Sequence, residues 1–277
     1  MSLLCAAVVQ LRTPADQREA FDHVAPLIRQ AAAEGAALIC TPEGTNILQR
    51  DRGRLAAALR TEAADPCVSG LRALAAELGV HLLIGSALLA REDAADGRAA
   101  NRSLLVGPDG AVLARYDKLH LFDVDLPTGE RVRESEAYAP GAAAVTAPGP
   151  GCRLGLTICY DVRFPHLYRD LARAGAEVIA VPSAFTRPTG EAHWSVLLRA
   201  RAIETGAFIL APAQGGLHPD GRSTWGRSMI VGPWGEVLAE APGDEPCLLT
   251  AALDMAAVAR ARAAIPALRH DREYARP

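Results

Sequence analysis

Several short segments of the chain are apolar at most positions, and each has the length of a β-strand. Successive side chains of a strand point to opposite faces of its sheet, so a strand without polar positions has both faces buried. Helices are the usual cover for such strands in α/β proteins. Segments of this kind are Leu3–Gln10, Ala37–Cys40, Val80–Leu89, Cys152–Cys159, Glu177–Ser183 and Ala207–Ala213.

Helix-length stretches with apolar residues at helical spacing lie between these strands. The first is expected at Pro14–Gly35, since proline suits a first helical turn and glycine suits the position after the last turn. The other helical stretches are expected at residues 55–60, 68–78, 165–174, 193–205 and 255–264. This alternation predicts an α/β fold. The 277 residues contain no linker and no break in composition, so residues 1–277 are expected to form a single domain.

Two hairpins and one long loop interrupt this alternation. The hairpins are predicted from the turn residues Pro108-Asp109-Gly110 and Pro233-Trp234-Gly235, which separate pairs of strand-like segments. The loop covers about Leu119–Pro140, and an unstructured loop of that length in a compact domain is usually functional or disordered.

Composition argues against several classes of partner. The formal net charge is −3 and no basic stripe with interleaved aromatic residues is present, so we expect no nucleic-acid partner. No apolar run reaches the length of a membrane span, and the apolar N-terminus lacks the basic region of a signal peptide. We therefore expect a cytoplasmic protein without membrane association. The six cysteines show no C-x-x-C spacing and the histidines no H-E-x-x-H spacing, so we expect no metal site and no redox pair.

Three chemically useful side chains follow predicted strands, and ligands of α/β folds bind at strand ends. Glu43 follows the second strand, Lys118 ends the first hairpin and Cys159 ends the strand "RLGLTIC". A thiol is only a few per cent ionised at neutral pH, so a cysteine nucleophile needs a base, which Glu43 could supply. Lys118 could stabilise a developing negative charge, and the start of the helix at Pro165–Ala174 would favour a thiolate.

Each of these residues alone has a simpler explanation. A cysteine that ends an apolar strand is more often a small buried hydrophobe, as we expect for Cys5, Cys40 and Cys247. Taken alone, Glu43 would be a loop residue or a helix cap, and Lys118 would be a surface residue. Periodicity does not bring the three residues together in space.

Six segments, in order along nearly the whole chain, resemble the nitrilase, or carbon–nitrogen hydrolase, superfamily. They are "TPEGTN", "YDKLHLFDVD", "ESEAYAPG", "GLTICYDVRFP", "VPSAFTRPTGEAHW" and "RARAIETGAFILAPAQ". The resemblance implies a four-layer α-β-β-α sandwich, a Glu-Lys-Cys triad and no metal or cofactor. It also implies a small-molecule amide and water as reactants, and a homodimer or higher homo-oligomer.

The triad of the superfamily corresponds to Glu43, Lys118 and Cys159 in this sequence. A second glutamate, which precedes a "PG" in the long loop of the family, corresponds to Glu134, with Glu136 as the alternative assignment. The resemblance thus assigns Cys159 as the nucleophile, Glu43 as the base, Lys118 as an oxyanion donor and Glu134 as a supporting group.

Within the superfamily, the run Cys159-Tyr160-Asp161 is closer to the amidase branches than to true nitrilases, which usually resemble "C-W-E". Two branches resemble the chain best. Deaminated glutathione amidases come first, and ω-amidases, which act on 2-oxoglutaramate or 2-oxosuccinamate, come second. An aliphatic amidase or an N-carbamoyl hydrolase of the same superfamily remains a further alternative.

Substrates of both branches carry a carboxylate, which a guanidinium binds well. Arg163 is therefore a candidate carboxylate clamp, with a structural salt bridge to Asp161 or Asp170 as the equal alternative. The other candidate substrate-binding residues are Tyr160, Ser183, Phe185 and Thr186.

Two functions of other classes compete with this interpretation. A papain-like Cys-His protease could use His120, His166 or His193, but the "C-G-S-C-W" signature of that family is absent. A non-catalytic binding protein is disfavoured because all three triad residue types are present.

Overall fold

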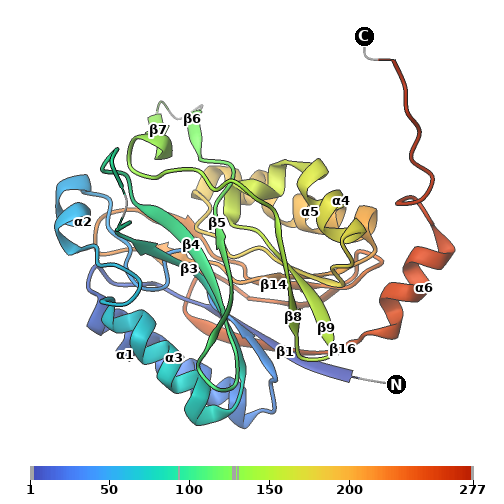
Figure 1. Cartoon of the computed structure of the whole chain (residues 1–277), viewed down its shortest axis with the longest axis horizontal. Coiled ribbons are helices and arrows are strands. Elements are labelled where there is room, and N and C mark those ends of the chain that lie inside the picture. Colours follow the sequence, from blue (N-terminus) through green and yellow to red (C-terminus); the bar gives the residue numbers. More distant parts are fainter. Residues whose placement is uncertain (1–2, 93, 127–128, 130, 276–277) are drawn as a thin grey trace.

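Two six-stranded β-sheets lie face to face at the centre of the structure (Figure 1). The computed structural model describes residues 3–92, 94–126, 129 and 131–275. The first sheet has the order β16 (Cys247–Asp254), β1 (Leu3–Gln10), β2 (Leu38–Cys40), β3 (His81–Leu89), β4 (Ala100–Val106), β5 (Val112–Asp117). The second has the order β15 (Val237–Glu240), β14 (Met229–Val231), β11 (Phe208–Ala211), β10 (Val178–Ala180), β9 (Cys152–Leu156), β8 (Val145–Gly149).

Helices cover the outer face of each sheet (Figure 1). The pair α1 (Gln17–Ala33) and α3 (Pro66–Leu78) packs on the first sheet, and α4 (Pro165–Arg173) and α5 (Arg187–Thr205) pack on the second. The remaining helices are α2 (Arg52–Ala58), α6 (Ala256–Ala264) and the short 3₁₀ helices η1 (Glu134–Glu136) and η2 (Cys159–Arg163). The predicted α-β-β-α sandwich is confirmed. Within the described residues, no helix has both the length and the apolar character needed to cross a membrane.

Strand β1 shows why the apolar segments have no polar face. Its residues Leu4, Ala6 and Val8 pack into the core between the two sheets. The alternate residues Ala7 and Val9 pack into a second core beneath α1 and α3. Both sides of the strand are buried, so polar side chains are excluded from both.

Several predicted boundaries differ from the observed ones. The first helix begins at Gln17 and not at Pro14, because the side chain of Asp16 caps it by accepting hydrogen bonds from the backbone N–H groups of Arg18 and Glu19. The fifth helix begins at Arg187, six residues before the predicted start at His193, with a proline in its first turn.

The predicted long loop contains secondary structure. Strands β6 (Asp123–Asp125) and β7 (Arg131–Arg133) form a two-stranded ribbon in it, and η1 follows. A second ribbon, β12 (Gly215–Leu217) with β13 (Ser223–Trp225), was not predicted, because three-residue strands carry too little periodicity to be recognised.

The sheet topology brings the ends of several strands together at the same edge of each sheet. Strands β2 and β3 are parallel, β4 runs antiparallel to β3, and β5 runs antiparallel to β4. The end of β2, the start of β4 and the end of β5 therefore lie at the same edge of the first sheet. Strands β9 and β10 are also parallel, so their C-terminal ends share one edge of the second sheet.

Gly85 lies in β3 where the loops that leave β2 and β10 pass one another. A Cβ atom there would overlap the carbonyl oxygen of Thr41 and press on the side chain of Pro182. Thr41 and Pro182 lie in buried segments that lead to Glu43 and Ala184. Neither residue can shift to make room for a Cβ atom without displacing these segments. A glycine is therefore required by close approach and not by backbone conformation.

We expect Gly85→Ala to destabilise the protein by about 1–3 kcal/mol or more, as overpacking of a filled interior does. Gly53→Ala is the matched control, because its Cβ would meet nothing closer than 3.4 Å. Urea denaturation of both variants measures the effect. Equal stability of Gly85→Ala and the unmodified protein would show that the two loops are not packed as described.

Candidate active site

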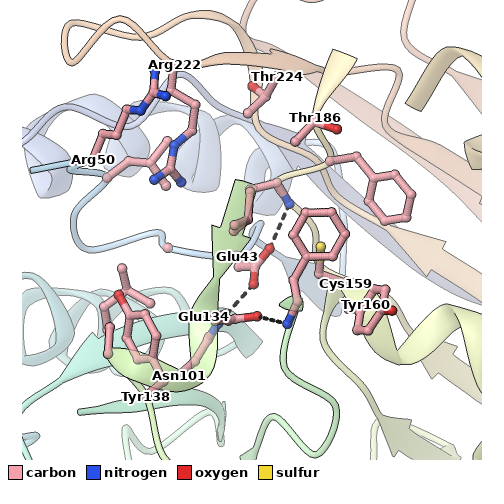
Figure 2. Close-up of a pocket in the computed structure, with 18 of the residues that line it drawn as sticks. Glu43, Arg50, Asn101, Glu134, Tyr138, Cys159, Tyr160, Thr186, Arg222 and Thr224 are labelled. Atoms are coloured by element: carbon pink, nitrogen blue, oxygen red, sulfur yellow. Dashed lines mark hydrogen bonds between the residues drawn. The ribbon is translucent and has the colours of Figure 1, made fainter. Parts of the chain in front are cut away.

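Three side chains from separate strands meet at the shared edge of the sheets. Glu43 comes from the segment after β2, Lys118 follows β5, and Cys159 begins η2 after β9. The Nζ atom of Lys118 lies 2.8 Å from Oε1 of Glu43, and the thiol of Cys159 lies close enough to the Glu43 carboxylate to affect its pKa. Figure 2 shows Glu43 and Cys159 facing the same cavity.

Glu43 is a buried carboxylate held on both oxygens. Oε1 also accepts a hydrogen bond from Nδ2 of Asn101 at 2.9 Å, and Oε2 accepts one from the backbone N–H of Ala184 at 2.9 Å. Burial raises the pKa of this carboxyl group. The attraction of Lys118 and the hydrogen bonds that Glu43 accepts have the larger effect, so the pKa is lowered overall. Glu43 is therefore ionised at neutral pH.

Lys118 is 2% exposed and lies between two carboxylates. Both oxygens of Glu134 lie 2.9 Å from its Nζ atom, and the Glu134 carboxylate also accepts the backbone N–H of Phe122 at 2.6 Å. Burial lowers the pKa of the Lys118 ammonium, but Glu134 and Glu43 outweigh that effect and raise the pKa well above its usual value. Glu136 is exposed and pairs with Arg52, so Glu134 is the glutamate that reaches Lys118.

Cys159 has an unusual backbone conformation for a residue with a side chain. Its φ angle is 50°, and its N–H donates to the carbonyl oxygen of Pro182 at 2.9 Å. Such left-handed residues cluster at functional sites, where the surrounding structure holds them. Burial and the Glu43 carboxylate raise the pKa of the thiol well above its usual value. Helix α4 begins at Pro165, as predicted, directly after the 3₁₀ helix η2 that Cys159 opens.

Asp161 ties the Cys159 turn to the strand that carries Lys118. Its Oδ2 atom accepts hydrogen bonds from the Tyr116 hydroxyl at 2.6 Å and from the Ile158 N–H at 2.8 Å. Its Oδ1 atom accepts the backbone N–H of His120 at 3.0 Å and lies 2.7 Å from Nδ1 of the same histidine. One fully buried carboxylate thus connects both sides of the site.

These side chains open into a cavity of about 710 Å³. Tyr160, Arg163, Phe185 and Thr186, four of the predicted substrate-binding residues, line it. Ser183 does not reach the cavity: it is fully buried, and its hydroxyl donates to the carbonyl oxygen of Val181 at 3.0 Å. The cavity is large enough for a drug-sized molecule.

Arg163 is half-buried in the wall of the cavity. Its guanidinium lies over the rings of Tyr160 and Phe185, 5.8 Å and 5.4 Å from their centroids, and 3.3 Å from Nδ1 of His193. Neither Asp161 nor Asp170 forms a salt bridge with it among the described residues. The guanidinium is held by rings and remains able to bind an anion.

The structure adds groups that the sequence reading missed. Asn101 bridges Glu43 and Glu134, donating to the latter at 3.2 Å, and the N–H of Ala184 orients Glu43. The available signal for Asn101 was an asparagine at the start of a strand, since asparagine is depleted in strands. A backbone N–H leaves no signal, because every residue except proline has one.

The arrangement suits nucleophilic attack by a neutral thiol whose proton passes to a carboxylate. The partner of Cys159 is Glu43 and not an imidazole, so the geometry gives no support to a Cys-His protease. In the described part of the chain, no group of three or more His, Cys, Asp or Glu side chains is arranged to hold a metal ion.

The sequence is similar to proteins of one family. Residues 5–263 match the carbon-nitrogen hydrolase family. The chain is 40% identical over 267 residues to the deaminated glutathione amidase of Synechocystis sp., and the match covers 96% of this chain and 97% of that protein.

Two solved structures are similar in fold. The C. elegans NitFhit protein has a TM-score of 0.89 and 34% sequence identity, and the match covers 98% of this chain and 66% of that longer chain. A mutant of the amidase from Nesterenkonia sp. AN1 has a TM-score of 0.79 and 28% identity, over 97% of this chain and 94% of that one. That structure shows the acetamide moiety of fluoroacetamide added covalently at the active-site cysteine.

The charge state of the site predicts a broad pH profile. The base form of Glu43 is present above its lowered pKa, so kcat/KM should stay flat down to about pH 5 and fall only below the usual glutamate value of about 4.3. The raised pKa values of Lys118 and Cys159 place any alkaline loss above about pH 9. Initial rates across pH 4–10, with recovery at pH 7 as the control for unfolding, measure this. An acid limb near pH 6.5 would instead indicate a histidine base.

Proposed function

Because the chain belongs to the carbon-nitrogen hydrolase family, we propose that it cleaves the amide bond of a small 2-oxo acid amide through a thioester on Cys159. The chain is an amidase, a hydrolase of carbon–nitrogen bonds other than peptide bonds. The observation that carries the proposed mechanism is the convergence of Glu43, Lys118 and Cys159 at the edge of the two sheets.

In the first half-reaction, the Sγ atom of Cys159 attacks the amide carbonyl carbon while the thiol proton passes to Glu43. The Nζ atom of Lys118 and the backbone N–H of Tyr160 bind the oxyanion of the tetrahedral intermediate. The intermediate collapses when the C–N bond breaks, and the leaving nitrogen takes the proton from Glu43. A thioester and a free amine, or ammonia, result.

In the second half-reaction, a water molecule attacks the thioester and gives a proton to Glu43. The same donors bind the second oxyanion, the C–S bond breaks, and Glu43 returns the proton to the sulfur. Glu134 keeps the Lys118 ammonium in place through both of its oxygens. The net reaction converts one amide and one water into a carboxylic acid and an amine.

The Nesterenkonia sp. AN1 amidase supports this assignment, because its active-site cysteine carries a covalent adduct derived from an amide. The wall position of Arg163 supports an anionic acyl group. The name of the Synechocystis sp. relative supports deaminated glutathione as the substrate, ahead of 2-oxoglutaramate.

We expect Cys159→Ala to abolish turnover without unfolding the protein. Lys118→Ala should lower kcat by at least about 10²–10³, the usual cost of one oxyanion donor. Glu43→Gln should lower it by about 10²–10⁴, the usual contribution of a general base, and the combined loss should be far from additive. Cys152→Ala is the matched control, because Cys152 lies in β9 outside the cavity. Single-turnover rates with thermal unfolding of each variant measure this. Near-normal activity of Lys118→Ala would remove that residue from the mechanism.

We expect Arg163→Lys to lower kcat/KM for 2-oxo acid amides about tenfold to hundredfold, because a lysine cannot make the bidentate contact of a guanidinium. The assay compares deaminated glutathione, 2-oxoglutaramate and a neutral aliphatic amide of similar length. Equal turnover of the neutral amide would contradict a carboxylate clamp. A tenfold preference for 2-oxoglutaramate would assign the chain to the ω-amidases.

We also infer that residues 1–277 act as one domain and that the protein forms a homodimer or a higher homo-oligomer. Support comes from apolar side chains that are exposed in the isolated chain, among them Val196 and Ile203 on α5 at 69% and 55% exposure. Such side chains are commonly covered at subunit interfaces.

A further inference from the structure

Several arginine side chains line the cavity. Among the described residues, the arginines that line it are Arg50, Arg52, Arg131, Arg133, Arg163, Arg187 and Arg222. Four of these arginines form salt bridges with local carboxylates. The recorded pairs are Arg52 with Glu136, Arg131 and Arg133 with Asp125, and Arg187 with Asp244.

Two of the lining arginines have no carboxylate within salt-bridge distance in the described part of the chain. One is Arg163, beside the nucleophile. The other is Arg222, which is half-buried in the connection between β12 and β13. The nearby acid Asp220 accepts the backbone N–H of Arg222 at 2.9 Å and does not pair with its guanidinium.

The two arginines lie on different sides of the cavity. Arg163 is held against Tyr160 and Phe185, whereas Figure 2 shows Arg222, together with Arg50, across the cavity from Cys159 and Tyr160. Thr224, which also lines the cavity, bonds through Oγ1 to Nε2 of the buried His218 at 2.7 Å. The side of the cavity opposite Cys159 therefore carries the Arg222 guanidinium, which has no carboxylate partner among the described residues.

A substrate bound through the acyl side places its scissile carbonyl at Cys159. Its acyl carboxylate then lies toward Arg163, and its leaving amine extends toward the opposite wall. A simple ω-amide releases ammonia and leaves this part of the 710 Å³ cavity unused. An amide whose amine is a dipeptide would fill it and would present a carboxylate to Arg222.

We propose that Arg222 binds a carboxylate on the leaving-amine side, so that the site selects amides with one carboxylate on each side of the scissile bond. In deaminated glutathione, that carboxylate is the C-terminal one of the cysteinylglycine leaving group. This inference rests on the proposed function, since it takes Cys159 as the nucleophile and the Arg163 side as the acyl side.

The test measures binding without turnover. Isothermal titration of Cys159→Ala uses deaminated glutathione and the same compound with its C-terminal carboxylate converted to a carboxamide. A charge-assisted contact should make the acid bind about tenfold to hundredfold more tightly than the carboxamide. In Cys159→Ala/Arg222→Met, the ratio of the Kd of the carboxamide to the Kd of the acid should fall to about one. In Cys159→Ala/Arg222→Lys, this ratio should be intermediate.

Arg52→Met in the same background is the matched control. Arg52 lines the same cavity but is neutralised by Glu136, so its loss should keep the preference for the acid. Thermal unfolding of each variant verifies that it is folded. Equal affinities for the acid and the carboxamide with Arg222 present, or an unchanged affinity ratio after Arg222→Met, would overturn the inference. Failure of the acid to bind would do the same.

Turnover by the unmodified protein tests the proposed function separately. Release of cysteinylglycine from deaminated glutathione together with an unchanged binding ratio in Arg222→Met would keep the function and reject the role of Arg222. Hydrolysis of neither deaminated glutathione nor 2-oxoglutaramate would reject the proposed function, whatever the binding ratio.

Discussion

The site is organised around one ammonium group buried between two carboxylates. Lys118 is almost inaccessible to solvent, and a buried charge of this kind persists only when it is paired and hydrogen-bonded. Glu43 and Glu134 supply that pairing from two distant parts of the chain. Removing one member of such a group typically costs about 3–5 kcal/mol, because the remaining charges are left buried without compensation. The cluster therefore joins the end of β2, the end of β5 and the η1 segment into one unit.

The chemistry of Cys159 depends on this cluster. The same carboxylate that pairs with Lys118 lies beside the Cys159 thiol, and the pKa directions leave Glu43 ionised and the thiol neutral. In the proposed mechanism, proton transfer from the thiol to Glu43 is therefore coupled to attack on the substrate and does not precede it. The left-handed backbone of Cys159 and the buried Asp161 hold the sulfur in position, so the site is formed before substrate binds.

Charge is distributed differently in the rest of the cavity. Four arginines that line the cavity form salt bridges with nearby carboxylates, which makes them part of the wall. Among the described residues, Arg163 and Arg222 have no carboxylate within salt-bridge distance, and they lie on different sides of the cavity, the first near Cys159 and the second across from it. This layout is complementary to a molecule with separated negative charges and a neutral amide between them. Selectivity of this kind comes from the placement of charge more than from cavity size.

The sequence by itself determined the class of fold and identified the candidate triad. Apolar segments such as Leu3–Gln10 require cover on both faces, so an α/β fold follows from local pattern, and the four-layer sandwich follows from the resemblance of the ordered motifs. Ordered motifs along the chain identified Glu43, Lys118 and Cys159, whose convergence the structure shows.

Only the tertiary structure decided which other groups join the triad. Whether Glu134 or Glu136 reaches Lys118 depends on the turn of η1, and Ser183 is turned away from the cavity although it belongs to a recognised motif. The N–H of Ala184 and the guanidinium of Arg222 acquire their positions from strand register and from sheet packing. These contacts join residues that are far apart in sequence, and local periodicity carries no information about the register that brings them together.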